Sequence, residues 1–329
     1  MSELPSYAVI SPVKDEAVHL ARTAEALLAQ THKPTQWVIV DDGSTDATAA
    51  IAARYAEQHD WISLIGARSS GRRERGAPIV RAFKQGAATL SASPEVLVKL
   101  DGDLFFASHY FAWVASVFAA DPRAGIVGGV VFVNEDGRWV YDRVSHRTVH
   151  GAIKAYRREC LEDIGGLHES MGWDGIDEYG ARARAWNVHV LSELGVLHYK
   201  SRGSAQPWLR ARWEEGRGAH YMGYRPSAVA RRVGYRMLVE HPPMLGGITL
   251  GLGYCWHSLR GSAQAEPLAR AQLREEQRGI LRRSLRSGEH APSLLPGGGP
   301  AYAMTGSGEQ APGAGAGHAP PVPAGTLSG

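Results

Sequence analysis

The sequence predicts an α/β protein built on a mostly parallel sheet. Short apolar or β-branched runs recur along the first 133 residues, and the stretches between the first four of them carry the spacing of amphipathic helices. The expected strands are Tyr7–Ser11, Gln36–Val40, Ile62–Gly66, Val96–Leu100 and Ile126–Val133. Alternation of strand and helix is typical of a parallel sheet, which binds its ligands beyond the carboxyl ends of the strands. Residues directly after these strands are therefore the first place to search for function.

Helices are expected between the strands of this half. The clearest are Ala17–Gln30, Ala47–Gln58 and His109–Ala120. Ser44 and Asp46 precede the second of these helices and Ser108 precedes the third, and such side chains favour the N-cap position. The sequence thus places two polar loops next to helix starts.

After about residue 148 the pattern becomes mixed, and then helical. The expected elements are helices at Cys160–Gly165, Asp174–Trp186 and Gln206–Tyr221, strands at Val188–Leu191 and Val196–Tyr199, and further helices at Pro226–Glu240, Met244–Leu259 and Pro267–Leu285. From Ser287 onward Gly, Pro, Ala and Ser dominate, and such a composition does not repay the entropy of ordering. The predicted organisation is a catalytic domain at 1–205, a helical appendage at 206–286 and a disordered tail at 287–329.

Composition limits the functional classes. The chain has 329 residues with 44% hydrophobic residues, enough for a sizeable core, and its net charge of +3 is too mild to favour nucleic acid as the main partner. Cys160 and Cys255 stand in no metal-ligand spacing. No secretory signal is visible, and the weakly polar run Pro242 to Trp256 falls short of the roughly 20 apolar residues that a membrane-spanning helix needs. A cytoplasmic location is expected.

Two acidic motifs follow predicted strands. The run Val38-Ile-Val-Asp-Asp-Gly-Ser-Thr-Asp46 ends in carboxylates that could accept a hydrogen bond from a nucleobase, or could equally shape a turn and cap a helix. The run Val98-Lys-Leu-Asp-Gly-Asp103 brings the carboxylates of Asp101 and Asp103 within reach of one ion, a geometry that suits Mg²⁺ or Mn²⁺ bridging a diphosphate. A D-x-D tripeptide is common by chance, and its place after a fourth strand gives it weight.

A third motif supplies candidates for a catalytic base. Asp174 and Asp177 stand in Gly172-Trp-Asp-Gly-Ile-Asp-Glu178 at the start of a predicted helix. A carboxylate facing an acceptor could take the proton of an attacking hydroxyl, while an acid at a helix N-terminus is also favoured by the dipole alone. Trp173 could stack on a sugar ring or simply pack in the core.

These motifs, in this order, resemble glycosyltransferase family 2 with its GT-A fold. The segments that carry the resemblance are Tyr7-Ala-Val-Ile-Ser-Pro-Val-Lys-Asp-Glu16, Leu28-Ala-Gln-Thr-His-Lys-Pro34, Trp37-Val-Ile-Val-Asp-Asp-Gly-Ser-Thr-Asp46, Leu100-Asp-Gly-Asp103, Gly151-Ala-Ile-Lys-Ala-Tyr-Arg-Arg158 with Ile164-Gly-Gly166, and Gly172 to Glu178. The resemblance covers about residues 5–205 and implies a Rossmann-like GT-A domain with a C-terminal helical appendage.

The resemblance also implies roles for single residues. Pro12, Val13 and Glu16 match the loop that cradles the nucleoside, Asp42 matches the carboxylate that recognises the base, and Asp101, Gly102 and Asp103 match the diphosphate and metal site. His198 stands where some GT-A enzymes supply a further metal ligand, although a lone histidine is as often structural.

The resemblance leaves two candidates for the catalytic base. The family's base precedes a small residue and an aromatic by about eleven positions, which selects Asp174 because of Ala185 and Trp186. The glutamate that usually precedes the base is replaced by Trp173, so Asp177 also remains a candidate.

Basic residues could contribute to either substrate. Arg72, Arg73 and Arg75 could neutralise a diphosphate or belong to a solvated loop, and we take Arg75 as the candidate. Lys154, Arg157 and Arg158 form a cluster on the predicted acceptor side, where the alternative is a solvated or glutamate-paired face; Arg157 is the candidate acceptor ligand.

The leading hypothesis is an inverting, metal-dependent transferase that moves a sugar from a nucleotide-sugar to a saccharide or lipid-linked acceptor in surface polysaccharide synthesis. The segment Arg225–Leu259 mixes arginines with apolar residues, which suits a peripheral contact with the inner face of a membrane or packing on the domain or a second subunit. A catalytically silent assembly partner is the alternative. A nicotinamide-dependent oxidoreductase is disfavoured because no G-x-G-x-x-G follows the first strand.

Overall fold

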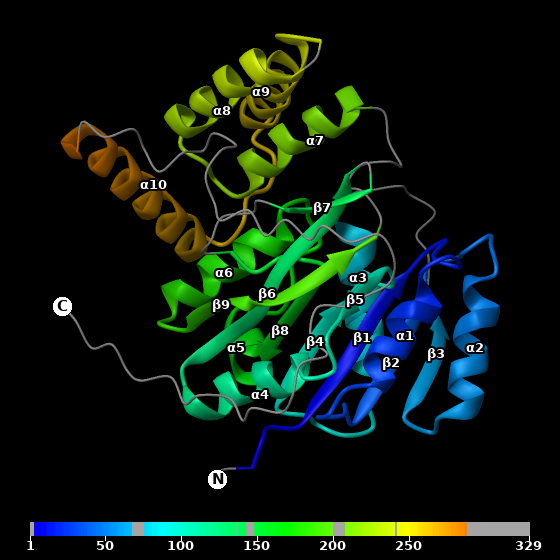
Figure 1. Cartoon of the computed structure of the whole chain (residues 1–329). Coiled ribbons are helices and arrows are strands. Elements are labelled where there is room, and N and C mark those ends of the chain that lie inside the picture. Colours follow the sequence, from blue (N-terminus) through cyan, green and yellow to red (C-terminus); the bar gives the residue numbers. More distant parts are fainter. Residues whose placement is uncertain are drawn as a thin grey trace.

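A nine-stranded mixed sheet forms the centre of the protein (Figure 1). The computed structural model describes residues 3–67, 76–135, 137–142, 148–199, 208–240 and 242–287. The strands are β1 (Tyr7–Val13), β2 (Gln36–Asp41), β3 (Ile62–Gly66), β4 (Val96–Leu100), β5 (Leu104–Phe106), β6 (Ala124–Glu135), β7 (Arg138–Tyr141), β8 (Ile153–Arg157) and β9 (Asn187–His198). Their order is β3-β2-β1-β4-β8-β6-β9-β5, with β7 paired to β6.

Strand direction confirms the predicted parallel core. β3, β2, β1 and β4 are mutually parallel, and β6 is parallel to β9. The strand β8 is antiparallel to both of its neighbours, β4 and β6, and short β5 is antiparallel to β9. The carboxyl ends of β1, β2 and β4 therefore lie along one edge, where the sequence placed its acids.

Six helices cover the two faces of the sheet. They are α1 (Leu20–Leu28), α2 (Thr48–Gln58), α3 (Ala77–Ala88), α4 (Tyr110–Ala120), α5 (Arg158–Asp163) and α6 (Trp173–Ala183). Alternate residues of each strand enter opposite cores, as the pleat requires. Val9 and Val98 pack with α1, α2 and α4, whereas Ile10 and Val38 pack in the core that contains α3, α5 and α6. Burial on both faces explains why these strands are largely apolar.

Several local predictions were wrong. Strands β5, β7 and β8 were not predicted, because β5 and β7 are short and β8 begins with an alternation of apolar and basic residues. The two strands expected at Val188–Leu191 and Val196–Tyr199 form one strand, β9, with an irregularity opposite Gly129 and Val130.

The predicted helix caps are only partly present. Helix α4 begins after His109 without a side-chain cap, so the cap expected at Ser108 is wrong. Asp46 does accept a hydrogen bond from the backbone N–H of Thr48, the first residue of α2, at 2.9 Å. Ser44 and Asp46 also connect the loops after β1 and β2: Ser44 Oγ accepts a hydrogen bond from Asp15 N at 3.0 Å, and Asp46 accepts one from Ala17 N.

Four further helices form a layer beside the sheet (Figure 1): α7 (Trp208–Tyr221), α8 (Pro226–Val239), α9 (Leu245–Leu259) and α10 (Pro267–Ser287). Helix α10 contacts α6 through Leu273, Ala269 and Ile176. Helix α9 lies against α7 so closely that a Cβ at Gly216 would be 2.2 Å from the carbonyl oxygen of Leu250. In the described residues, no helix combines the length and hydropathy needed to cross a membrane. Apart from residue 287, the predicted disordered tail lies outside the described residues.

Candidate active site

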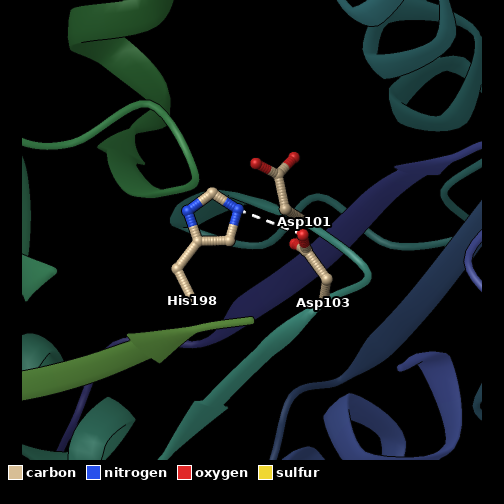
Figure 2. Close-up of side chains that lie close together, drawn as sticks. All are labelled: Asp101, Asp103 and His198. Carbon is tan, nitrogen blue, oxygen red and sulfur yellow. Dashed lines mark ion pairs between the residues drawn. The ribbon is translucent and has the colours of Figure 1, made fainter. Parts of the chain in front are cut away.

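The pairing of β5 with β9 brings a histidine to the D-x-D motif. Asp101 and Asp103 lie in the turn between β4 and β5, and Leu104 of β5 is opposite His198, the last residue of β9. The next amide, Tyr199 N, donates a hydrogen bond to the carbonyl of Asp103 at 3.0 Å. As a result His198 Nε2 lies 3.1 Å from Asp103 Oδ2 (Figure 2).

Asp101, Asp103 and His198 fit a divalent metal. One ligand atom from each side chain lies within 4.8 Å of the others, and the three side chains converge (Figure 2). Burial of His198 disfavours its protonation, but its hydrogen bond to Asp103 and the charges of Asp103 and Asp101 outweigh this and raise its pKa. Nδ1 of His198 is buried and has no hydrogen-bond partner among the described residues. Two carboxylates and an imidazole suit Mn²⁺, and the carboxylates alone suit Mg²⁺.

A buried lysine, Lys99, pairs with Asp101 of this metal-ligand group. The sequence did not lead us to predict it. Lys99, in the middle of β4, has a side chain only 2% exposed. Its ammonium lies 2.5 Å from Asp101 Oδ1 and 2.7 Å from the carbonyl oxygen of Gly151. A lysine inside the apolar run Val96–Leu100 was the available signal, because a buried charge needs a charged or polar partner. One oxygen of Asp101 is thus already paired.

A cavity of about 230 Å³ opens beside the acids. Its lining contains the predicted residues Pro12, Val13, Glu16, Asp42, Asp101, Gly102, Asp103 and His198, and also Lys14, Pro78, Ile79 and Ala82, which were not predicted. Gly102 permits this close packing, since a Cβ there would lie 2.9 Å from Val13 Cγ1. The structure therefore brings together the predicted nucleoside and diphosphate residues.

The two adjacent aspartates after β2 have different surroundings. Asp41 accepts hydrogen bonds from the backbone and hydroxyl of Ser44, so it shapes the turn. Asp42 lines the cavity, and its backbone carbonyl accepts a hydrogen bond from Lys14 at 2.7 Å. The loop that follows β1 is held by the same region: Thr48 Oγ1 accepts from Glu16 N at 2.7 Å, and Asp15 accepts from Thr45 N at 2.7 Å.

The two candidate bases lie in different environments. Asp177 is fully buried; its carboxylate pairs with Lys154 at 3.0 Å and accepts a hydrogen bond from the hydroxyl of Tyr156 at 2.6 Å. Asp174 is half-buried at the start of α6. A Cβ on Gly151 would lie 2.8 Å from Asp174 Oδ2, so this carboxylate packs against the residue whose carbonyl binds Lys99. The geometry does not fit Asp177 as a base and leaves Asp174.

Two predicted acceptor contacts do not fit the structure. Arg157 is opposite Val96, at the end of β4 remote from Asp101, and donates hydrogen bonds to the carbonyls of Ala124 and Phe118. Its position could not be foreseen because β8 was not predicted. Trp173 is only 5% exposed and packs in the core with Lys99 over its ring. Arg75, with Arg72 and Arg73, lies outside the described residues.

The chain is similar in sequence to known proteins. The sequence profile of glycosyl transferase family 2 matches residues 8–172. Beta-monoglucosyldiacylglycerol synthase of Nostoc sp. (strain PCC 7120) is 23% identical over 257 residues, which is 71% of this chain and 53% of that protein. The chain thus spans about half the length of this curated relative.

Solved structures show the same fold. The mannosyltransferase PcManGT from Pyrobaculum calidifontis, in complex with GDP-Man and Mn²⁺, has a TM-score of 0.50 at 18% identity, over 87% of this chain and 82% of that one. TarS 1-349 of S. aureus, in complex with UDP-GlcNAc, has a TM-score of 0.53 at 18% identity, over 86% of this chain and 92% of that one.

The mixed α/β sheet and its likeness to these glycosyltransferase structures place the chain in the GT-A fold class, as predicted. Within that class, the chain belongs to glycosyltransferase family 2.

Proposed function

We propose that this protein transfers a sugar from a nucleotide-sugar donor to a hydroxyl acceptor with the help of a divalent metal. The observation that carries the proposal is the convergence of Asp101, Asp103 and His198 at the edge of the cavity that Asp42 also lines. A nucleobase at Asp42 and a diphosphate at Asp101 and Asp103 would fit the two ends of that cavity. PcManGT, which has the same fold, is seen with GDP-Man and Mn²⁺.

The donor residues would act mainly by positioning. Asp42 would accept a hydrogen bond from the base, while Pro12, Val13 and Glu16 would hold the nucleoside in the loop tied to β2. Asp103 and His198 would hold the ion directly, and Asp101 would use the oxygen that Lys99 leaves available. The bound metal would neutralise the charge that grows on the diphosphate as it departs. We favour Mn²⁺ over Mg²⁺ because an imidazole belongs to the group.

Asp174 is the proposed base of an inverting reaction. The acceptor oxygen forms its bond to C1 of the sugar as the bond from C1 to the diphosphate oxygen breaks, and the hydroxyl proton passes to the Asp174 carboxylate. No protein nucleophile is needed for a single displacement. Asp174 is half-buried in the first turn of α6. The ammonium of Lys154 donates a hydrogen bond to its backbone carbonyl at 2.6 Å, which fixes the position of the residue.

The acceptor is proposed to be a saccharide or a lipid-linked sugar of a surface polysaccharide. A relative is named a synthase of a glucosylated diacylglycerol, which supports acceptors presented at a membrane. We further propose that residues 1–205 form the catalytic domain. Residues 206–286 would form an appendage that binds either the inner face of a membrane, as part of a peripheral membrane protein, or a second subunit.

The test is a thermal-shift screen of UDP-, GDP- and dTDP-sugars with Mn²⁺ and with Mg²⁺, because a ligand that binds only the native state raises its apparent stability. We expect one donor class to raise the melting temperature in the presence of metal. Asp174→Asn should keep that shift and lose roughly 10²–10⁴-fold in turnover, as expected for a general base. A protein that binds donor and metal but has no turnover in wild-type form would indicate the silent assembly partner instead.

A further inference from the structure

The outward face of helix α9 is apolar along its whole length. Six exposed residues recur there at helical spacing and carry no charge: Leu245, Ile248, Leu252, Cys255, Trp256 and Leu259. The other exposed residue of α9, Ser258, is polar and uncharged. Leu252 is 57% exposed and Leu259 is 87% exposed. We call these six residues the α9 face. Surface helices normally direct their large apolar residues inward, so this arrangement is inverted.

The inward side of α9 explains the inversion. It is formed largely by small residues, and a Cβ at Gly247 would lie 2.5 Å from the carbonyl oxygen of Val233, while one at Gly253 would lie 2.5 Å from that of Trp213. The backbone of α9 is thus packed directly on α8 and α7. Among the large side chains of α9, Leu250 is buried in this contact and the Trp256 ring meets Trp213 of α7 at 6.3 Å. Leu245, Ile248, Leu252 and Leu259 stay exposed and available for another surface.

The apolar surface continues around the connection between α8 and α9. Leu238 is 84% exposed, and Val239 and Met244 are also exposed. Large apolar side chains are therefore exposed both on the α9 face and on the residues that precede it in the chain.

The charge of the appendage favours an anionic partner. Residues 206–286 contain 14 arginines and six glutamates, with no lysine or aspartate. Arg212, Arg232 and Arg236 are paired with Glu215 and do not define the outer charge. Arg260, directly after α9, is exposed, and its guanidinium lies 4.1 Å from the centroid of the Trp256 ring. An arginine stacked on an exposed tryptophan, next to apolar residues, is typical of a helix at a lipid interface.

A second copy of the chain is a weaker candidate for this face. A helix of 15 residues is about 22 Å long, and a stripe about 10 Å wide along it offers on the order of 200–400 Å². A stable protein interface buries about 800 Å² on each partner. A bilayer needs no such area, because a few large apolar side chains and nearby arginines are sufficient for reversible binding.

We propose that the α9 face docks the protein on an anionic bilayer, with α9 lying in the plane of the lipid headgroups. Leu252 and Trp256 enter the acyl boundary, and Arg260 meets lipid phosphates or other anionic headgroups. This placement deepens the proposed function, since it would bring the catalytic domain to acceptors held in the membrane.

The α9 face contains its own reporter site. Cys255 is free and exposed, whereas Cys160 is buried, and burial, with a smaller contribution from nearby Asp177, raises the pKa of the Cys160 thiol to about 12. A thiol-reactive environment-sensitive fluorophore should therefore label Cys255 selectively at neutral pH. We expect its emission to shift to the blue when vesicles with phosphatidylglycerol are added to the full chain, and brominated lipids to quench it. An emission spectrum unchanged by vesicles would overturn the proposal.

Vesicle flotation of unlabelled protein tests the residues. Leu252→Glu with Trp256→Glu should weaken binding to anionic vesicles at least tenfold, and Arg260→Gln roughly fivefold, as one arginine near an anionic surface contributes. Val18→Glu is the matched control, because Val18 is an exposed apolar residue of the catalytic domain, and it should bind like wild type. Circular dichroism of each variant confirms that it is folded.

Two outcomes would contradict the proposal: equal binding of wild type to vesicles of phosphatidylcholine alone, or a dimer that Leu252→Glu dissociates while no vesicle binding occurs. The assay contains no donor, so its failure would leave the proposed transferase activity standing. Absence of donor binding would likewise leave the docking result standing.

Discussion

Lys154 holds together a buried ionic cluster behind the proposed base, and its removal should be costly. Its ammonium has no exposed surface and contacts Asp177 at 3.0 Å, Glu178 at 2.9 Å and the carbonyl of Asp174 at 2.6 Å. In Lys154→Met, the buried carboxylate of Asp177 would lose its cation, and Glu178 would keep only its ion pair with Arg182 at 3.2 Å. Removing one partner of a buried ion pair typically costs about 3–5 kcal/mol, and we expect a loss in that range.

The loss should depend on pH in a definite direction. Burial raises the pKa of Glu178 to about 7, although Lys154 opposes this shift. A carboxyl group with a raised folded pKa binds more protons in the folded state than in the unfolded state, so its contribution to stability falls as the pH rises from about 4.5 through 7. Without Lys154 this pKa rises further, and the destabilisation by Lys154→Met should be larger at pH 8 than at pH 6.

Urea unfolding followed by circular dichroism measures this difference. The matched control is Lys84→Met, because Lys84 forms an exposed ion pair with Glu169 at 3.4 Å and such pairs contribute about 0–1 kcal/mol. A Lys154→Met protein within about 1 kcal/mol of wild type at both pH values would refute the buried-charge reasoning.

Two further predictions concern charges elsewhere. Lys99→Met should raise the affinity for Mn²⁺ about tenfold in a calorimetric titration, because it removes a positive charge bonded to Asp101. The same change should lower turnover, because the Gly151 carbonyl loses its hydrogen bond. An unchanged affinity for Mn²⁺ would contradict this prediction. Burial opposes ionisation of Glu215, but Arg232 and Arg236 outweigh it and lower its pKa. The Glu215 carboxylate stabilises the fold above about pH 4.5, and this contribution is lost as the pH falls. The free energy of unfolding of Glu215→Gln, measured by urea titration, should therefore decrease less than that of wild type when the pH is lowered below about 4.5. The same decrease in both proteins would argue against the pairing.

The sequence was sufficient to predict most of the residues that line the cavity. β1 and β2 end at Val13 and Asp41, Asp101 directly follows β4, and parallel strands bring such ends to one edge. The cavity beside Asp42 and Asp103 follows from that rule, together with the family resemblance. The local sequence pattern and the direction of the strands were enough to predict these cavity residues.

The remaining features depend on contacts between distant segments. The position of His198 next to Asp103 is set by β5, a strand of three residues with no recognisable pattern of its own. Arg157 was assigned to the acceptor side because its strand, β8, was not predicted and its direction was unknown. Asp174 and Asp177 are three residues apart in one helix, and only the partners of Lys154 distinguish the half-buried carboxylate from the buried one.

The central claim is that Asp101, Asp103 and His198 hold a metal that is required to bind the donor. Calorimetric titration of the donor selected by the thermal screen tests it most directly, with Mn²⁺ and with EDTA, on wild type, Asp103→Asn and the control Asp60→Asn in an exposed turn. The account predicts donor binding to wild type and to Asp60→Asn only with Mn²⁺, and at least tenfold weaker binding to folded Asp103→Asn. Equal donor affinity in EDTA, or in Asp103→Asn, would contradict it.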